Sequence, residues 1–190
     1  MPYFQIKLQA AADDYPPVVD VASFLYDFNF LYELFRLGTD PEYAQYQFSE
    51  DTRSRQHRPL IADQQLHVVT LRQESPLMLV AAVAAIPSAI GAILGLLQII
   101  EKIANWPVNR EMLKLQRDKL RADLKKMEIP DPTSTEDHEP SEKLQLREGQ
   151  FLIDDVLRRL NSGRIRISDF RIDLVRQLPR KHQNRDSASE

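Results

Sequence analysis

The chain has 190 residues, a formal net charge of −3, 43% hydrophobic residues and no cysteine. This length accommodates one modest domain with extensions. The lack of cysteine excludes disulfides, thiolate nucleophiles and cysteine metal ligands, and the slightly acidic balance gives no global attraction to nucleic acid. Residues 1–6 contain no basic segment followed by an apolar one, so we expect no cleaved secretory signal.

The first 65 residues predict a strand, a helix and an irregular segment. Residues 3–8 alternate between apolar and polar side chains, which is typical of a strand. Apolar residues then recur at three- and four-residue steps over 18–37, which predicts an aromatic-rich core helix ending near Gly38 and Pro41. Residues 39–65 show no clear pattern, although Tyr43, Tyr46 and Phe48 would suit a short edge strand.

A second strand over 66–71 is followed by the most unusual stretch of the sequence. Leu77 to Ile100 is 24 residues long and carries no charge. Ser75 and Pro76 resemble a helix start, so we expect one apolar helix over 75–106 with a kink at Pro87. A helix over the uncharged residues would be about 36 Å long, enough to cross a hydrocarbon core of about 30 Å.

The remaining residues predict a charged helix over 107–128, a disordered linker over 129–140, a helix over 141–160, a strand over 164–175 and a disordered tail over 179–190. Alternation in the last strand slips by one residue at Ser168 and Asp169, as a β-bulge would produce. We expect residues 141–178 to dock on residues 1–74, because a helix and one strand are too small to fold alone.

These elements predict an α+β fold. It would contain a small mixed sheet of about three strands, in which the N- and C-terminal strands lie together, with packed helices and one long projecting apolar helix.

The apolar helix has three interpretations. It could span a membrane, be buried or form oligomers in a soluble protein, or lie in a lipid interface. We discount the last because no polar face precedes Gln98. The other residues look too few to cover such a helix in a monomer. Small residues at four-residue steps would give a helix–helix contact: Ala84, Ser88, Gly91 and Gly95.

The charges that flank this helix bear on its location. Basic residues follow it closely, which would place its C-terminal side in the cytoplasm, but no signal would export the N-terminal part. A re-entrant, kinked or oligomer-buried helix keeps both flanks cytoplasmic. We therefore expect the inner membrane, with the bulk of the chain in the cytoplasm.

No catalytic, cofactor or metal site is predicted. The four histidines are not at metal-ligand spacing from one another, and no phosphate-binding or nucleophile motif occurs. Two basic groups could contact anions, although solvated surfaces are the more common use of such residues: Arg53, Arg55 and Arg58 in a loop, and Arg164 and Arg166 on the last strand. Nucleic acid is disfavoured because that strand has few aromatic side chains to stack on bases.

The segments 32–34, 39–43 and 75–77, followed by an apolar and then a charged helix, resemble uncharacterised bacterial proteins of similar layout. The resemblance covers roughly residues 30–128. It implies a bacterial origin and a signalling or defence context, with no functional residue to carry over.

The sequence therefore predicts a non-enzymatic, membrane-associated interaction or adaptor module that self-associates through its apolar helix and could also bind a protein partner. The alternatives are a soluble homo-oligomer with a shared helical core and a membrane-disrupting effector of a bacterial conflict system. Because no constellation supplies a nucleophile, base or metal, an enzyme is the least favoured class.

Overall fold

A computed structural model describes residues 2–12, 16–72, 77–103, 107–126 and 149–176 of the chain. Its strands are β1 (Tyr3–Ala12), β2 (His67–Arg72), β3 (Leu77–Ala84) and β4 (Ile165–Val175). Its long helices are α1 (Val18–Thr39), α2 (Pro87–Ile103), α3 (Pro107–Lys126) and α5 (Gln150–Ser162). Short 3-10 turns occupy the connection 40–66 between α1 and β2. The predicted linker and tail lie outside the described residues.

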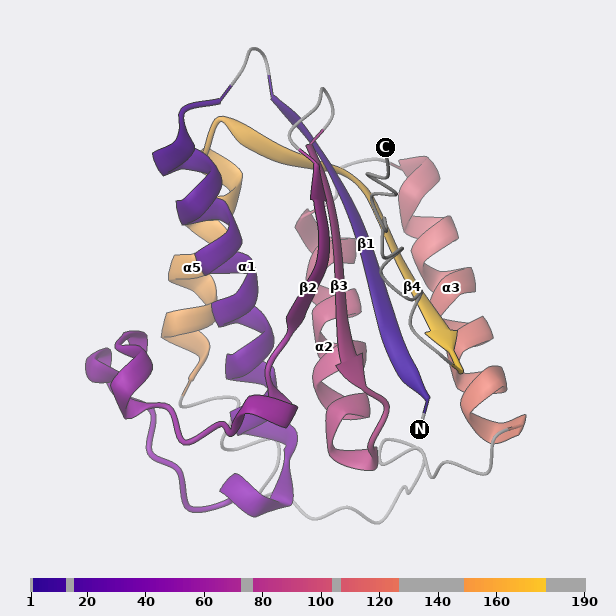
Figure 1. The fold of residues 1–190 in the computed structure, drawn as a ribbon, viewed down its shortest axis with the longest axis horizontal. Helices are drawn as coiled ribbons and strands as arrows, with labels where there is room; N and C mark the ends of the chain where they lie inside the picture. The colour runs from indigo at the N-terminus through magenta and orange to yellow at the C-terminus, as the bar shows by residue number, and fades with distance from the viewer. Residues whose placement is uncertain (1, 13–15, 73–76, 104–106, 127–148, 177–190) are drawn as a thin grey trace, which may run out of the picture.

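The strands form one antiparallel sheet in the order β2-β3-β1-β4 (Figure 1). The predicted α+β fold and the pairing of the N- and C-terminal strands are therefore confirmed. The sheet has four strands rather than three, and all its pairs are antiparallel rather than mixed. The predicted bulge in the last strand is also present, because the register between β1 and β4 shifts between Gln9 and Ala10, opposite Ile167 and Asp169.

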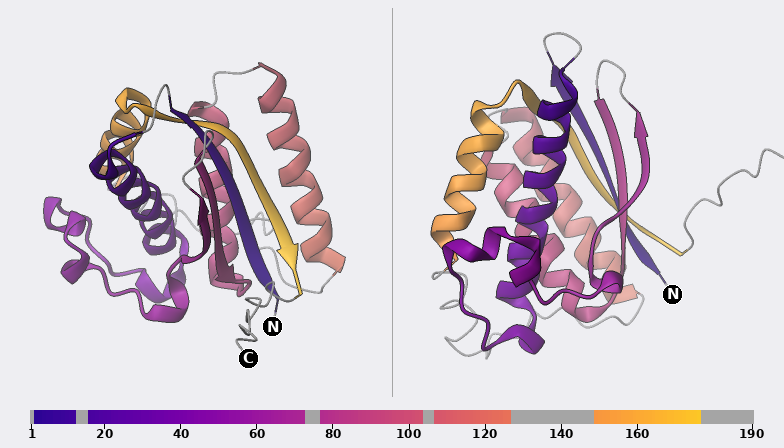
Figure 2. Two further views of the ribbon diagram at one scale, coloured as in Figure 1. Left: turned by 45° about the horizontal axis from the view of Figure 1, so that its top comes forward. Right: turned by 60° about the vertical axis from the view of Figure 1, so that its left-hand side comes forward.

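The helices cover one face of the sheet, which gives two layers (Figure 2). Alternate residues of β1 and β3 point into the helical layer and are almost fully buried: Phe4, Ile6, Leu8, Leu77, Leu79, Ala81 and Val83. Aromatic residues of α1 meet this face, and the rings of Phe28 and Phe170 are 6.1 Å apart in an edge-on contact. The core thus joins residues from both ends of the chain.

The single apolar helix predicted over 75–106 is wrong over residues 77–86. Residues 77–84 form β3, a strand that lies between β2 and β1, and the helix begins only at Pro87. A short apolar run suits a buried strand as well as a helix, and Val80 and Val83 favour the strand. Pro87 is therefore the first helical residue and not a kink, as suits a residue without an N–H to donate.

Helix α2 does not project from the domain. Its apolar side chains between Ala89 and Ile100 are at most 8% exposed, and α2 packs against both α1 and α3. The expectation that a bilayer or a second copy must cover this helix does not hold, because a third of the apolar stretch is a strand and the chain itself buries the helix that remains. None of the helices in the described ranges is both long and apolar enough to cross a membrane.

Two smaller expectations also differ from the structure. Residues Tyr43, Tyr46 and Phe48 form no strand; Pro41–Tyr43 is a 3-10 turn, capped by the Asp40 carboxylate, which accepts from the Glu42 N–H at 3.1 Å. Helix α1 continues through Gly38 to Thr39, since Gly38 is buried inside its last turn and Asp40 ends the helix.

Candidate functional site

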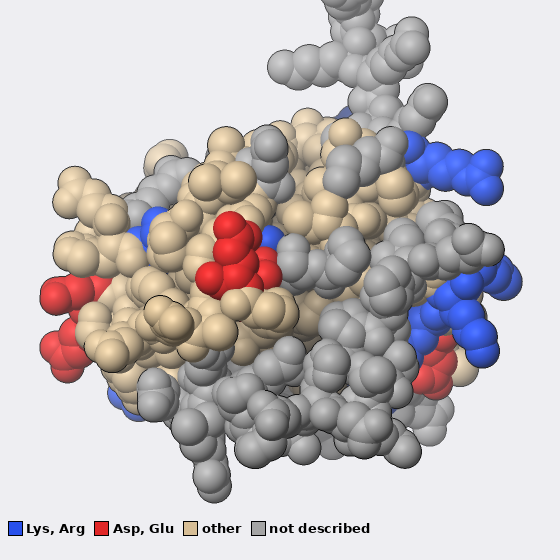
Figure 3. Space-filling model, turned by 90° about the horizontal axis from the view of Figure 1, so that it is seen from below, with Lys and Arg blue, Asp and Glu red and all other residues tan. Residues whose placement is uncertain are grey.

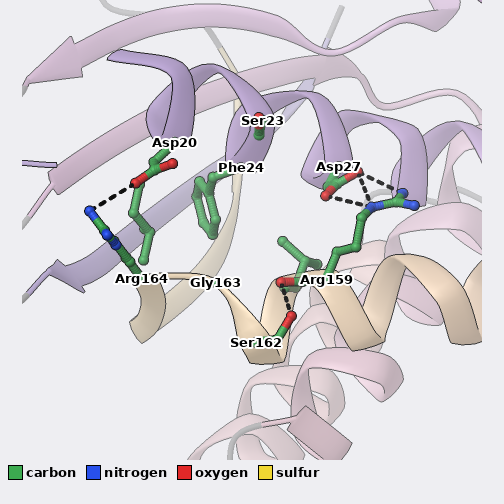
Figure 4. A pocket seen from close by; sticks show the side chains of 10 residues that line it. Asp20, Ser23, Phe24, Asp27, Arg159, Ser162, Gly163 and Arg164 are labelled. Carbon is green, nitrogen blue, oxygen red and sulfur yellow. Dashed lines mark hydrogen bonds and ion pairs between the residues drawn. The ribbon is translucent and has the colours of Figure 1, made fainter. Parts of the chain in front are cut away.

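A pocket of about 210 Å³ lies between α1 and the C-terminal end of α5 (Figure 4). Helical spacing places four α1 residues on one side of it, because residues three and four apart share a helix face. The end of α5 and the start of β4 supply the other side. The lining residues are Asp20, Ser23, Phe24, Asp27, Arg159, Leu160, Ser162, Gly163, Arg164 and Ile165.

The charges of this pocket are engaged with one another. The Arg159 guanidinium donates to both carboxylate oxygens of buried Asp27, at 2.8–3.1 Å, and also to Asp155. Arg164 and Asp20 form a looser pair with 3.9 Å between Nη1 and Oδ2, and the Arg164 side chain is 77% exposed. The described lining residues include neither histidine nor cysteine beside the serines, so they provide no activated nucleophile. The ion pairs of this pocket chiefly hold α5 against α1.

A second polar cluster joins α1 to the connection 40–66. The guanidinium of Arg58 contacts the carboxylate of Glu33, and each side chain is only 2% exposed. The amide of Asn29 donates to the other Glu33 oxygen at 2.8 Å. Arg58 also lies 4.9 Å from the ring centroid of Phe30, a cation–π distance. Burial lowers the pKa of Arg58, because desolvation disfavours its charged form.

Next to this cluster, Gln64 receives two tyrosine hydroxyls. Tyr32 donates to its backbone carbonyl at 3.0 Å, and Tyr43 donates to its side-chain oxygen. Burial raises the pKa of Tyr32 and, to a smaller extent, that of Tyr43, because the phenolate would lose its hydration. Arg36 and Asp40 complete the cluster with Nη2 and Oδ2 2.9 Å apart, although the orientation falls outside hydrogen-bond geometry. These contacts hold the connection 40–66 on α1, directly before β2.

The outer side of β2, residues 67–72, is the most accessible part of the sheet, and we call it the β2 edge. Val68 and Leu71 are 60% and 43% exposed, and His67 and Arg72 are also exposed. The right-hand view of Figure 2 places β2 at the outer border of the sheet. A strand with one free side presents unpaired backbone N–H and C=O groups.

The β2 edge displays its apolar side chains on one face. Val68 lies opposite Ala81 and Leu71 opposite Leu79, and both β3 partners point into the helical layer. The register shift between Val68 and Thr70 brings Val68 and Leu71 to the same face although they are three residues apart. No helix of the described ranges buries these two side chains, so an apolar strip runs along the border of the sheet.

The opposite border of the sheet differs, because α3 packs beside β4. A groove of about 370 Å³ separates them, lined by apolar residues and by both charge signs: Gln116, Lys119, Leu120, Asp123, Arg171, Ile172, Asp173 and Leu174. Of the two outer strands, β2 is therefore the one without a flanking helix among the described residues.

The residues predicted for a helix–helix contact do not share one helix. Ala84 is the last residue of β3, and Ser88 lies in the first turn of α2. Gly91 and Gly95 do lie at a helix–helix contact, but its partner is α1 of the same chain. An added Cβ would come within 2.8 Å of Thr39 Oγ1 at Gly91 and within 2.4 Å of Phe35 Cδ1 at Gly95. The face that we expected to meet a second copy is thus occupied.

The five arginines predicted as anion contacts are not brought together. Arg58 is buried against Glu33, whereas Arg53 is half exposed and contacts Asp155 on α5. Arg164 lies beyond the other end of α5, and Arg166 is exposed opposite Ala11 on the face of the sheet away from the described helices. Arg55 is in a 3-10 turn. On the face shown in Figure 3, basic side chains gather at the right-hand end with an acidic group below them, and the rest of the described surface there shows little basic area.

Sequence reasoning missed the β2 edge and the two buried clusters. The sequence contains a signal for the β2 edge. Strand β2 has the polar residues His67 and Arg72 at its two ends, as suits an outer strand, whereas 77–84 is apolar throughout, as suits an inner one. The sequence also contains a signal for the buried clusters, because Asp27, Glu33 and Arg36 are charged residues inside an otherwise apolar helical pattern.

Comparisons with protein-family models, curated proteins and solved structures gave no match. Within the described ranges, no three histidine, aspartate or glutamate side chains lie close enough to hold a metal ion.

Proposed function

We propose that this chain is a non-enzymatic protein-interaction module that accepts an extended strand along the β2 edge. The observation that supports it is the exposure of Val68 and Leu71 on a border strand with no flanking helix among the described residues. Strand addition satisfies the free backbone groups of such an edge, while alternate side chains give specificity.

The interaction role is the one predicted from the sequence, but the proposed contact surface is on β2 and not on α2. Gly91 and Gly95 already pack on α1, and the apolar side chains of α2 are buried. We do not carry the membrane expectation into the proposal, because these buried residues were its basis. The charged groups of the α1–α5 pocket contact one another and give no reaction centre to build on.

The test uses a displayed library of random peptides panned on the intact chain. Selected peptides should carry apolar residues at alternate positions and should slow amide hydrogen exchange of residues 67–72 when bound. Replacing Val68 and Leu71 together by lysine should abolish binding, because two ammonium groups would lie where the strand docks.

A matched double variant, Leu115→Lys with Phe151→Lys, controls for the loss of exposed apolar residues, since these side chains are 68% and 48% exposed on other elements. It should bind the selected peptides as the unchanged chain does. Peptides that protect residues outside 67–72, or a library that yields no binder, would overturn the proposal.

A further inference from the structure

We infer that the strand accepted by the β2 edge is β2 of a second copy of this chain, in an antiparallel, two-fold symmetric pair. The inference rests on the proposed function and names its partner. Its basis is that the exposed side chains of β2 complement themselves when the strand is turned around.

One register carries this complementarity. When Val68 lies opposite the partner's Leu71, the two-fold axis places Leu71 opposite the partner's Val68. Facing residues of an antiparallel pair point to the same side of the sheet. Val68 and Leu71 both point to the helical side. Each exposed apolar side chain would therefore meet an exposed apolar side chain, at the cross-strand distance where such pairs stabilise a sheet.

The remaining pairs of this register are compatible with it. Thr70 lies opposite Val80, on the face away from the described helices, and Val69 is the extra residue at the register shift between Val68 and Thr70. In the proposed register Val69 lies opposite the partner's Thr70. His67 lies opposite the partner's Arg72, and both side chains are exposed and can reach solvent. Sliding the partner by one residue would instead place Val68 opposite Thr70 and separate the apolar pairs.

The symmetry also limits the assembly. A two-fold contact uses the same edge on both copies, so it joins two four-stranded sheets into one of eight strands and leaves no β2 edge free. The borders of the larger sheet are then the two β4 strands, each with α3 beside it. We therefore expect the assembly to stop at a dimer.

The size of the contact sets its strength. Two six-residue strands with two apolar side chains each fall below the roughly 1,200–2,000 Å² that stable complexes bury. The dimer should therefore be reversible and depend on concentration. Sedimentation velocity should show a dimer at high protein concentration and a monomer at low protein concentration.

Engineered cysteines test the register, and the chain offers a background without native cysteine. Val68→Cys and Leu71→Cys are mixed as two single variants and oxidised mildly. Facing Cα atoms are about 4.5–5.5 Å apart, within disulfide range. The Cα atoms of residue 68 in the two copies would be offset along the strands by three residues, or about 10 Å, which is too far for a disulfide. The mixture should give a cross-linked dimer, and Val68→Cys alone should not.

The controls for self-pairing and the results that would contradict it differ from those of the peptide-binding test. Val68→Cys mixed with Leu115→Cys should remain uncross-linked, and the Val68→Lys, Leu71→Lys double variant should sediment as a monomer at every concentration. A native chain that stays monomeric up to near-millimolar concentration, or cross-linking of Val68→Cys alone as strong as that of the mixture, would overturn the self-pairing. If selected peptides still protect residues 67–72 in that case, the proposed function stands with another partner.

Discussion

The pair Glu33 and Arg58 illustrates how single residues determine the position of a long irregular segment. Both side chains are almost completely buried, and Arg58 comes from the connection 40–66, whereas Glu33 comes from α1. Removing one member of a buried pair leaves an uncompensated charge and costs about 3–5 kcal/mol. We expect Arg58→Met to lower the free energy of unfolding by that amount, measured by urea denaturation.

The double variant Glu33→Leu with Arg58→Met should recover much of this loss, because no buried charge remains unpaired. Arg53→Met is the exposed control: Arg53 also contacts an aspartate, but its side chain is 47% exposed, so the loss should be about 1 kcal/mol or less. A double variant as unstable as the sum of the two single ones would contradict the role assigned to the pair.

Tyr32 makes stability depend on pH in the alkaline range. Because burial raises its pKa in the fold, the folded protein keeps the phenol protonated at pH values where the unfolded chain, with a pKa near 10, loses the proton. Its contribution is fully present below pH 10 and is lost as pH rises above that value. The free energy of unfolding should fall more steeply above pH 10 in the unchanged chain than in Tyr32→Phe.

Tyr32→Phe also removes the hydrogen bond to the Gln64 carbonyl, so at pH 7 this variant should be less stable by about 0.5–1.5 kcal/mol. The informative quantity is therefore the slope of stability against pH and not its value at one pH. Parallel slopes for the two proteins above pH 10 would show that Tyr32 does not titrate differently in the fold.

At the scale of elements, the small-residue face of α2 is a contact inside the chain. Gly95→Ala would normally stabilise a helix by about 1 kcal/mol. Here the new Cβ would come within 2.4 Å of Phe35, so we expect a net loss of about 1–3 kcal/mol in the free energy of unfolding. Denaturation of Gly95→Ala in a Phe35→Leu background provides the comparison, where the substitution should cost less. An equal cost in both backgrounds would mean that the two residues do not collide.

Most elements could be predicted from the sequence because their periodicity is long and regular. Helix α1 and strands β1, β2 and β4 follow patterns of apolar residues that local sequence alone determines. Residues 77–86 lack that information, since apolar residues at every position satisfy both periods. Only the tertiary structure decides there: β3 lies between β2 and β1, where a strand buried on one face and flanked by strands on both sides is needed.

The candidate site was less predictable than the fold for a related reason. Asp27 and Arg159 are 132 residues apart, and Glu33 and Arg58 are 25 apart, so no local spacing indicates their pairing. The exposure of Val68 and Leu71 likewise depends on which strand ends up at the border and on where the helices stop. Sequence patterns give the character of a strand, whereas its position in the sheet comes from contacts across the whole chain.

At the scale of the whole molecule, the sheet and its core are incomplete without β4. β4 pairs with β1 along ten positions and supplies Ile165, Phe170 and Ile172 to the core. We expect residues 1–126 alone to show no cooperative thermal unfolding by circular dichroism. Co-expression with residues 141–190 should restore a cooperative transition and co-purify the two fragments. A fragment 1–126 that unfolds cooperatively by itself would contradict this dependence.

The pairing of β1 with β4 also has a consequence for synthesis on the ribosome. β1 leaves the exit tunnel before the other three strands, yet one of its two sides stays unpaired until residues 165–175 emerge. At about 5–20 residues per second, the roughly 90 residues between the end of β3 and the end of β4 take about 5–20 s to appear. Throughout that interval the nascent chain exposes a second strand edge that the finished protein hides, and this is when it most needs protection by a chaperone.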